Sequence, residues 1–379
     1  MCYHTKNDSV SKGGDAPLNR NDSSAGKDIS AALCGLYGSF GYARYKMNKF
    51  EEYDLYARNK DFLVADRVVT FTDTNGKLMA LKPDVTLSIA KNCRDVPGEV
   101  NKLYYDENVY RVSKGANAFR EIRQLGVECT GEVDDYCILE VLTLALSSLK
   151  AISGEYALDV SELSVLGELL DGCGLTSSQK REALRLVGEK NLHETETLCR
   201  AAGIDEQTAD VLKTLITSYG KPAEVLPALK ALLPQSAGLA RLERLTEALG
   251  DDVVRVDFSL VSDMSYYNGV VFKGYVGNIP ESVISGGQYD RLMEKMRHTS
   301  RAVGFAVYLD LLEEFSFSET EYDADALLLY GDANDPADVM RAARKLVGEG
   351  KRVCVRRNAP EKLRCREIID LTEGGAVHG

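Results

Sequence analysis

The chain has 379 residues, of which 44% are hydrophobic, so it is long enough to bury a large core divided among two or three units. Its formal net charge of −12 repels polyphosphate at long range, which disfavours nucleic acid as a partner although a local basic groove could still bind it. No apolar run approaches the roughly 20 residues of a membrane span, and the N-terminus lacks the hydrophobic stretch of a secretory signal. We therefore expect a cytoplasmic protein that does not enter a membrane.

Metal and cofactor sites find no support in the sequence. The nine cysteines and four histidines are scattered, without the paired spacing of a zinc ligand set. The phosphate-binding pattern GxxxxGK[ST], the dinucleotide pattern GxGxxG, the hydrolase pattern GxSxG and the zinc pattern HExxH are all absent. We expect reduced thiols, no metal and no cofactor.

The N-terminal third predicts a tail, one helix and several strands. Residues 1–27 are polar without apolar periodicity and are predicted to form a flexible tail. A helix is predicted from Asp28 to a stop at Gly41. Its expected buried face comprises Ile29, Leu33, Leu36 and Phe40. Strands rich in β-branched and aromatic residues are predicted at 66–73, 77–84, 102–112 and 122–131.

The middle of the chain is predicted to be mainly helical before strands return. A helix is predicted after Asp134, and Leu and Ala recur at spacings of three and four over residues 160–250, which indicates a helical insertion. Further strands are predicted at 252–260, at 270–277 and around Gly287. The buried face of the first of these is expected to hold Val254, Val256, Phe258 and Leu260.

A separate unit is predicted for residues 321–379, so that the main domain covers 28–320. Its apolar run ALLLY predicts a strand, Asp335 and Pro336 predict the cap and first residue of a helix, and RVCVR predicts a second strand. This pattern indicates a βαβ unit, to which we expect a further helix to be appended.

Four segments carry the functional information through their order and spacing. They are LKPDVT (81–86), VYRVSKGANAFREIRQLGVE (109–128), SDMSYYNGVVF (262–272) and GGQYDRLMEKM with AVGFAVYLDLL (286–312). Together they resemble the catalytic domain of class II histidyl-tRNA synthetases, over residues 28 to about 315. The resemblance implies an α+β fold, in which helices flank an antiparallel sheet, with a helical insertion and a small C-terminal α/β unit.

The same resemblance implies a histidine pocket. Asp84 matches the carboxylate that holds the ligand's amino group, with Asp in place of the usual Glu. Gln124 and Glu128 match groups that face the amino and imidazole ends, and the pair Tyr266 and Tyr267 matches the tyrosines beside the imidazole. The full expected histidine-binding set is Asp84, Thr86, Arg111, Gln124, Glu128, Tyr266 and Tyr267. Each residue alone has an ordinary structural explanation, but their joint occurrence in family order favours a pocket, where every buried donor needs a partner.

Groups that handle the nucleotide in the synthetases are missing at the matching positions. Ser262 stands where the family has the arginine that stabilises charge on the α-phosphate, and Asp263 adds a negative charge beside it. Leu311 replaces the arginine that clamps ATP, and Tyr308 replaces a glycine. We therefore expect no catalytic residues in this chain.

A retained amino-acid pocket without nucleotide groups resembles the regulatory subunits of ATP phosphoribosyltransferase, the first enzyme of histidine biosynthesis. The strings DFSLVSDMSYYNGVVFKGY (257–275) and SGGQYDRLMEKM (285–296) carry this resemblance. It implies a noncatalytic subunit that binds L-histidine for feedback inhibition. It also implies assembly into a hetero-octamer with a short catalytic subunit, which the regulatory subunit activates.

Two alternatives remain open at this point. One is an active histidyl-tRNA synthetase, which Ser262 and Leu311 disfavour. The other is a noncatalytic tRNA-sensing module, which the short C-terminal unit and the acidic charge disfavour.

Overall fold

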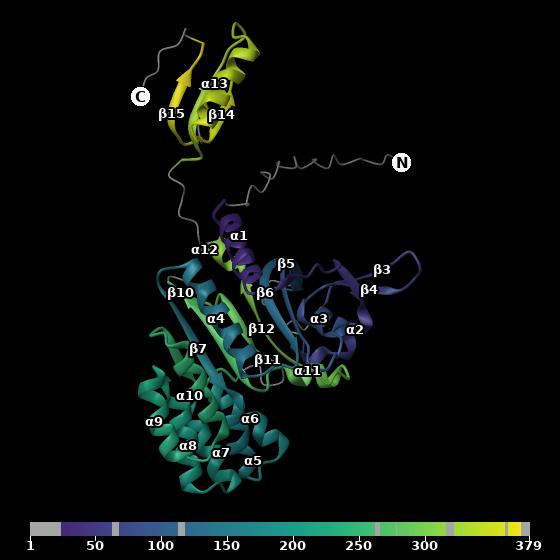
Figure 1. Cartoon of the computed structure of the whole chain (residues 1–379), viewed down its shortest axis with the longest axis vertical. Helices are drawn as coiled ribbons and strands as arrows, with labels where there is room; N and C mark the ends of the chain where they lie inside the picture. Colours follow the sequence, from purple (N-terminus) through teal and green to yellow (C-terminus); the bar gives the residue numbers. More distant parts are fainter. Residues whose placement is uncertain are drawn as a thin grey trace, which may run out of the picture. The chain divides into compact units, whose positions relative to one another are not determined.

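A computed structural model describes most of the chain. The described residues are 24–62, 68–112, 118–261, 266–277, 279–315, 322–360 and 363–372. The chain divides into two compact units, residues 1–314 and 315–379 (Figure 1). Most of the predicted N-terminal tail, residues 1–23, lies outside the described part.

A nine-stranded sheet forms the centre of the larger unit, in the order β1-β5-β6-β12-β11-β10-β7-β9-β8. Its strands are β1 Ala43–Arg44, β5 Val100–Val112, β6 Phe119–Gly131, β7 Tyr156–Glu162, β8 Tyr219–Gly220, β9 Val254–Asp257, β10 Val270–Val276, β11 Ile284–Gln288 and β12 Arg301–Tyr308. Neighbouring strands are antiparallel except for β1 with β5 and β7 with β9. The predicted antiparallel sheet is confirmed.

The two faces of this sheet differ in polarity, because successive side chains of a strand point to opposite sides. One face is apolar and lies under α4 (Asp135–Ile152) and α1 (Ser24–Ser39) (Figure 1). One row of residues across it runs Val127, Phe305, Gly286, Phe272, Val160 and Val256. The ring of Tyr37 from α1 meets the ring of Phe305 edge-on at 6.0 Å. This face holds the main core.

The opposite face carries polar and small residues. The neighbouring row across it runs Leu103, Glu128, Gly304, Gly287, Val271 and Ser161. Over this side lie the short helix α3 (Thr86–Asn92) and the segments that lead into β10 and out of β11. The face that is not needed for the main core is therefore the one available for a ligand.

The first helix differs from its predicted extent. It begins at Ser24, four residues before Asp28, and it ends at Ser39. Gly41 has φ +82°, a left-handed conformation that suits glycine and agrees with the predicted stop. The prediction that Phe40 is buried was wrong, since its side chain is 39% exposed. The helix ends at Ser39, one residue before Phe40, so the Phe40 side chain does not continue the helical face that packs on the sheet.

A smaller three-stranded sheet and two short helices complete the N-terminal part. The sheet consists of β2 (Phe50–Glu52), β4 (Leu78–Leu81) and β3 (Thr70–Thr72), in that order and antiparallel. The helices are α2 (Tyr53–Arg58) and the 3-10 turn η1 (Lys60–Phe62). Strand β4 leads directly into the turn before α3 and so positions the start of that helix.

Six helices lie between β7 and β9, interrupted by β8. They are α5 Leu163–Gly172, α6 Ser177–Gly188, α7 Leu192–Ala202, α8 Glu206–Thr217, α9 Pro222–Leu232 and α10 Ala237–Leu249. Figure 1 shows them gathered at one end of the larger unit. Polar side chains at Thr176, Asn191, Asp205 and Ser236 accept hydrogen bonds from the first turns of four of them. These caps explain why the helices begin where they do.

The C-terminal unit contains three parallel strands and one described helix. Strands β13 (Ala324–Leu329), β14 (Val353–Arg356) and β15 (Cys365–Asp370) lie in the order β14-β13-β15, and α13 (Pro336–Gly348) packs on them. Asp335 caps α13 as predicted, accepting a hydrogen bond from the backbone N–H of Ala337 at 2.8 Å. The prediction of an appended helix was wrong, because β15 pairs with the free edge of β13 instead.

The described ranges contain neither a helix that could span a membrane nor a cluster of metal-ligating side chains. No helix in them combines the length and the apolar character that crossing a bilayer requires. Over those same ranges, no three or more His, Cys, Asp or Glu side chains gather as metal ligands.

The apolar face of the sheet generates a stability prediction at Gly286. A Cβ atom there would lie 2.4 Å from Cβ of Phe305 and 2.7 Å from Cζ of Phe272, so Gly286→Ala should lower the free energy of unfolding by about 1 to 3 kcal/mol. Gly167→Ala is the control, because no atom lies within 4 Å of the added methyl and alanine favours the helix α5. Urea unfolding of both variants measures the difference. Equal stability of the two would contradict the packing described for this face.

Candidate functional site

Asp84 lies at the start of α3, in the turn that β4 leads into. Its side chain is 7% exposed, and Oδ1 accepts a hydrogen bond from the backbone N–H of Leu87 at 2.9 Å. Burial raises the pKa of the Asp84 carboxyl, and the positive charge of Arg111 opposes this rise. Nε of Arg111 donates to the carbonyl of Pro83 at 3.0 Å, which ties β5 to the same turn. The guanidinium of Arg111 is thus held near enough for its charge to act on Asp84.

Glu128 lies on β6 and is 2% exposed. Thr86 donates a hydrogen bond to Oε1 at 2.6 Å, and the hydroxyl of Tyr289 donates to Oε2 at 2.6 Å. A Cβ atom on Gly304 would lie 1.9 Å from Oε2, so the carboxylate rests directly on the backbone of β12 where a side chain is missing. Its position is therefore fixed from three elements.

The electrostatics of Glu128 follow from this setting. Burial, with a smaller contribution from the nearby charge of Asp84, raises the pKa of Glu128 to about 8, even though the hydrogen bonds from Thr86 and Tyr289 lower it. A cationic group or an N–H donor that entered the pocket would favour the ionised form. The surroundings of Glu128 are thus suited to a ligand that brings hydrogen-bond donors with partial or full positive charge.

Three tyrosines form an aromatic wall beside these carboxylates. The rings of Tyr266 and Tyr267 meet edge-on at 4.7 Å, and the ring of Tyr266 lies 5.9 Å from that of Tyr289. Tyr267 covers Gly287 on β11, where an added Cβ would lie 2.7 Å from Cδ1 of the ring. Burial raises the pKa of Tyr266 and Tyr289 well above its ordinary value, so both hydroxyls remain neutral. A flat ligand group can pack against such a wall.

Gln124 lies on the same face of β6 as Glu128, four residues away along the strand, and is 3% exposed. The residue opposite Gln124 on the neighbouring strand β5 is Glu107, which forms a part-buried ion pair with Lys82. Oε1 of Glu107 also accepts a hydrogen bond from the backbone N–H of Met47 at 3.3 Å. This pair ties β5 to the short segment between β4 and Asp84.

The structure brings most of the predicted residues together. Asp84, Thr86, Glu128, Tyr266 and Tyr267 share contacts or charge effects within one cluster, and Arg111 and Gln124 lie on the neighbouring parts of β5 and β6. These assignments to histidine binding stay predictions.

Two further residues belong to this site. Tyr289 lies within the string GGQYD, and its hydrogen bond to Glu128 is a role that the sequence did not predict. Tyr105 on β5 is 2% exposed, and burial together with the charges of Glu128 and Asp84 raises its pKa. Tyr105 lies in none of the four segments that carry the resemblance, so only its place opposite Gly126 in the sheet indicates that it belongs to the site.

The positions that matched lost nucleotide groups are only partly visible. Ser262 and Asp263 lie outside the described residues. Leu311 lies half-buried in α12 (Leu309–Phe315), and Tyr308 ends β12 opposite Gln124. An uncharged side chain therefore stands on α12 where an ATP clamp would need a cation.

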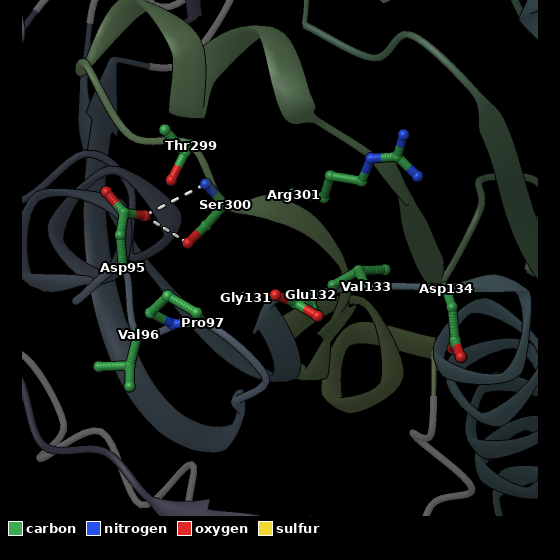
Figure 2. A pocket seen from close by; sticks show the side chains of 10 residues that line it. All are labelled: Asp95, Val96, Pro97, Gly131, Glu132, Val133, Asp134, Thr299, Ser300 and Arg301. Carbon is green, nitrogen blue, oxygen red and sulfur yellow. Dashed lines mark hydrogen bonds between the residues drawn. The ribbon is translucent and has the colours of Figure 1, made fainter.

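A hollow of about 490 Å³ lies where β6 ends and β12 begins (Figure 2). Its carboxylates already have partners within the protein. Asp95 accepts hydrogen bonds from the backbone N–H and hydroxyl of Ser300, and Glu132 accepts one from the backbone N–H of Gly98 at 2.9 Å. Asp134 caps α4. Most of the predicted histidine-binding residues gather around Glu128 and none of them lines this hollow, so the cluster around Glu128 is the stronger candidate.

Comparisons with known sequences agree with this geometry. The sequence model of the histidyl-tRNA synthetase family matches residues 17–312. The ATP phosphoribosyltransferase regulatory subunit of Oceanobacillus iheyensis is 26% identical over 345 residues, which cover 87% of this chain and 84% of that protein. The regulatory subunit of Thermus thermophilus is 29% identical over 309 residues, which cover 80% and 82%.

Solved structures share the fold. A structure from Bacillus halodurans, described as an ATP phosphoribosyltransferase regulatory subunit/histidyl-tRNA synthetase, has a TM-score of 0.74 at 24% identity and covers 91% of this chain and 93% of its own. Histidyl-tRNA synthetase from Nostoc has a TM-score of 0.67 at 18% identity, with 91% and 88% covered. A chain of the ATP phosphoribosyltransferase (HisG:HisZ) complex from Thermotoga maritima has a TM-score of 0.57 at 20% identity, with 74% and 96% covered. The class II synthetase fold is confirmed.

The raised pKa of Glu128 predicts how stability depends on pH. The folded chain holds this proton more tightly than the unfolded chain, so the carboxyl lowers the free energy of unfolding as pH rises from about 5 to about 8. Glu128→Gln removes this contribution, and the variant should gain about 1 to 3 kcal/mol relative to the parent over that interval. Urea unfolding at pH 5 and pH 8.5 measures it. Glu294→Gln, at an exposed position on α11 (Asp290–Lys295), controls for the loss of one negative charge. Parallel stability curves for the parent and Glu128→Gln would contradict the burial argument.

Proposed function

This chain belongs to the histidyl-tRNA synthetase family, and on that premise we propose that it serves as the noncatalytic regulatory subunit of ATP phosphoribosyltransferase in histidine biosynthesis. In this function the catalytic subunit carries out the reaction. The curated relatives that cover more than four fifths of this chain support the assignment, because they are regulatory subunits of that enzyme.

The observation that carries the proposal is the fixed carboxylate of Glu128 beside the tyrosine wall. An imidazole N–H can donate to Glu128 while the ring packs against Tyr266 and Tyr267. The α-ammonium group then faces the carboxylate of Asp84, with Gln124 near the same end. Arg111 is the cation available for the α-carboxylate. Each charged or polar part of L-histidine thus has a complementary group.

The charge distribution opposes synthetase chemistry at the same site. Adenylate formation develops negative charge on the α-phosphate, which the family stabilises with fixed guanidinium groups. The sequence has Ser262 and Asp263 at one such position and Leu311 at the other. A pocket that keeps amino-acid recognition without these cations fits a sensor better than a catalyst.

We propose further that the chain assembles with a short-form catalytic subunit into a hetero-octamer and also activates it. The HisG:HisZ complex from Thermotoga maritima contains a chain of the same fold, which supports assembly of this kind. L-histidine acts as the effector in this proposal. It can inhibit only by binding the inhibited state of the complex more tightly than the active state.

A first test is adenylate chemistry. The isolated chain should show no histidine-dependent exchange between ATP and pyrophosphate above background, because two transition-state cations are missing and each such group contributes about 10² to 10³ in rate. An authentic histidyl-tRNA synthetase assayed in parallel is the positive control. Clear exchange by this chain would establish the synthetase alternative.

A second test is the effector site. Glu128→Ala leaves a donor of the bound imidazole without a partner, which should weaken L-histidine binding by about 1.5 to 3 kcal/mol, or roughly ten- to a hundredfold. The inhibitory histidine concentration of the reconstituted complex should rise by a similar factor, while its uninhibited activity stays near the parent level. Inhibition curves and calorimetry measure both.

The matched control for this test is Glu294→Ala, which removes a carboxylate on the exposed side of α11. Sedimentation establishes that each variant still assembles. An unchanged inhibition curve in the assembled Glu128→Ala complex would place the effector elsewhere. A complex that dissociates would show that Glu128 has a structural function.

A further inference from the structure

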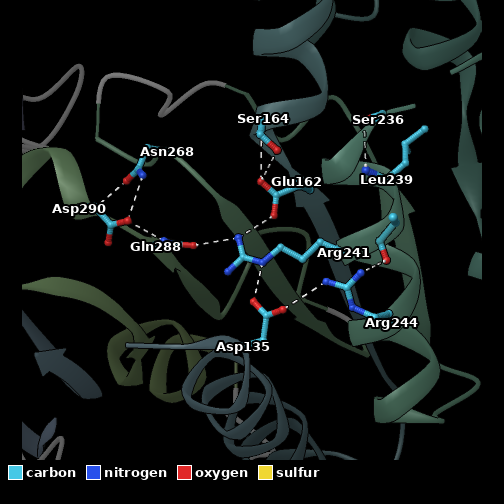
Figure 3. Close-up of polar contacts among 11 residues, drawn as sticks. Asp135, Glu162, Ser164, Ser236, Leu239, Arg241, Arg244, Asn268, Gln288 and Asp290 are labelled. Atoms are coloured by element: carbon cyan, nitrogen blue, oxygen red, sulfur yellow. Dashed lines mark hydrogen bonds and ion pairs between the residues drawn. The ribbon is translucent and has the colours of Figure 1, made fainter. Parts of the chain in front are cut away.

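Arg241 connects the helical insertion to the sheet (Figure 3). It lies on α10, and its Nε donates to Oδ1 of Asp135 at the start of α4 at 2.8 Å. Its Nη1 donates to Oε2 of Glu162, at the end of β7, at 3.2 Å and to Oε1 of Gln288, at the end of β11, at 3.3 Å. Glu162 is fully buried and Arg241 is 22% exposed. One guanidinium group therefore holds three elements of the larger unit to the insertion.

Gln288 continues this connection toward the pocket. Its Oε1 accepts from Arg241, and its Nε2 donates to Oδ2 of Asp290 at 2.6 Å (Figure 3). The amide can satisfy both partners in only one orientation, because a reversed amide would direct its N–H groups at a guanidinium and its oxygen at a carboxylate. A Cβ atom on Gly269 would lie 2.3 Å from Oε1, so the bare backbone there leaves room for the amide.

Asp290 and Asn268 then fix the two ends of the tyrosine wall. The backbone N–H of Asp290 donates to Oδ1 of Asn268 at 2.7 Å, and Nδ2 of Asn268 donates to Oδ2 of Asp290 at 3.3 Å. Asn268 directly follows Tyr267, and Asp290 directly follows Tyr289. The backbone of each pocket tyrosine is thereby held by a residue of this reciprocal pair.

A structural ion pair explains part of this arrangement. Glu162 is buried and needs a cation, which Arg241 supplies. That requirement does not explain why a buried glutamine stands between the guanidinium and Asp290, or why the chain of hydrogen bonds ends beside Tyr267 and Tyr289.

We propose that Arg241, acting through Gln288, is a positioning residue of the histidine pocket and couples the helical insertion to its occupancy. This inference rests on the proposed function of the pocket. Binding couplings are reciprocal, so a relay that helps α10 hold the pocket tyrosines also lets a ligand on those tyrosines stabilise α10. The insertion is then the part of the chain that responds to the effector.

The decisive variant is Gln288→Leu in the full-length chain, because it interrupts the relay while Arg241 keeps Asp135 and Glu162. We expect L-histidine binding to weaken about 3- to 20-fold by calorimetry. In the parent, saturating L-histidine should slow amide hydrogen exchange in α10. In Gln288→Leu that slowing should be lost even at saturation, which a change confined to affinity would not produce.

Two variants on α10 sharpen the comparison. Arg244→Ala removes an exposed arginine of the same helix, whose guanidinium donates to Oδ2 of Asp135 at 3.4 Å and to the backbone carbonyl of Ala240 at 3.3 Å (Figure 3). It should bind L-histidine as the parent does. Arg241→Lys keeps a cation for Glu162, but its compact ammonium group cannot span the separate acceptors that the planar guanidinium contacts, so it should behave like Gln288→Leu.

The outcomes separate the two proposals. A parent chain that binds no L-histidine, alone or with the catalytic subunit, would overturn the proposed function and this inference with it. A parent that binds L-histidine while Gln288→Leu binds equally well and keeps the slowed exchange in α10 would overturn the inference alone. Equal weakening by Arg244→Ala would also overturn it, because the effect would then belong to the helix surface in general.

Discussion

The proposed pocket depends on the two hydrogen bonds that satisfy the buried carboxyl group of Glu128. A carboxylate without water is costly unless hydrogen bonds satisfy its oxygens, and here Thr86 and Tyr289 donate one bond to each. Those two donors come from α3 and from the end of β11, so satisfying Glu128 requires segments distant in sequence to meet on β6. The pocket and its central acceptor are formed together.

The two-faced sheet makes this arrangement possible. Its apolar face packs under α1 and α4 and supplies the main core, so the other face can hold polar groups without loss of the core. Gly304 and Gly287 lie in adjacent strands on the polar face, and Glu128 and Tyr267 rest on them where larger residues would exclude both. The two glycines therefore let both side chains lie directly against the backbone of the sheet.

A catalytic ancestor of such a pocket needs two sets of charges, one for the amino acid and one for the nucleotide. In the proposed function, the carboxylates of Asp84 and Glu128 bind the amino acid, whereas the sequence has no cation at Ser262 or Leu311. Binding free energy that a synthetase would apply to a transition state is then available to shift an equilibrium between states of a complex. The relay from Arg241 through Gln288 offers a physical route by which such a shift would reach the helical insertion.

The sequence by itself determined the local features of this protein and the family pattern of its pocket. Alternation predicted the burial of Val254, Val256 and Phe258, and the cap at Asp335 predicted the start of α13, because both depend on residues close together along the chain.

Tertiary structure decided what depends on contacts between distant segments. The strand β15 formed where a helix was expected, because the free edge of β13 offers backbone partners that local propensity does not display. The contributions of Tyr105 and Arg241 to the site and its surroundings were likewise not evident in any motif. Tyr105 reaches the pocket through the register of β5, and Arg241 reaches Gln288 across 47 positions of sequence, so only the packing of strands and helices brings them there.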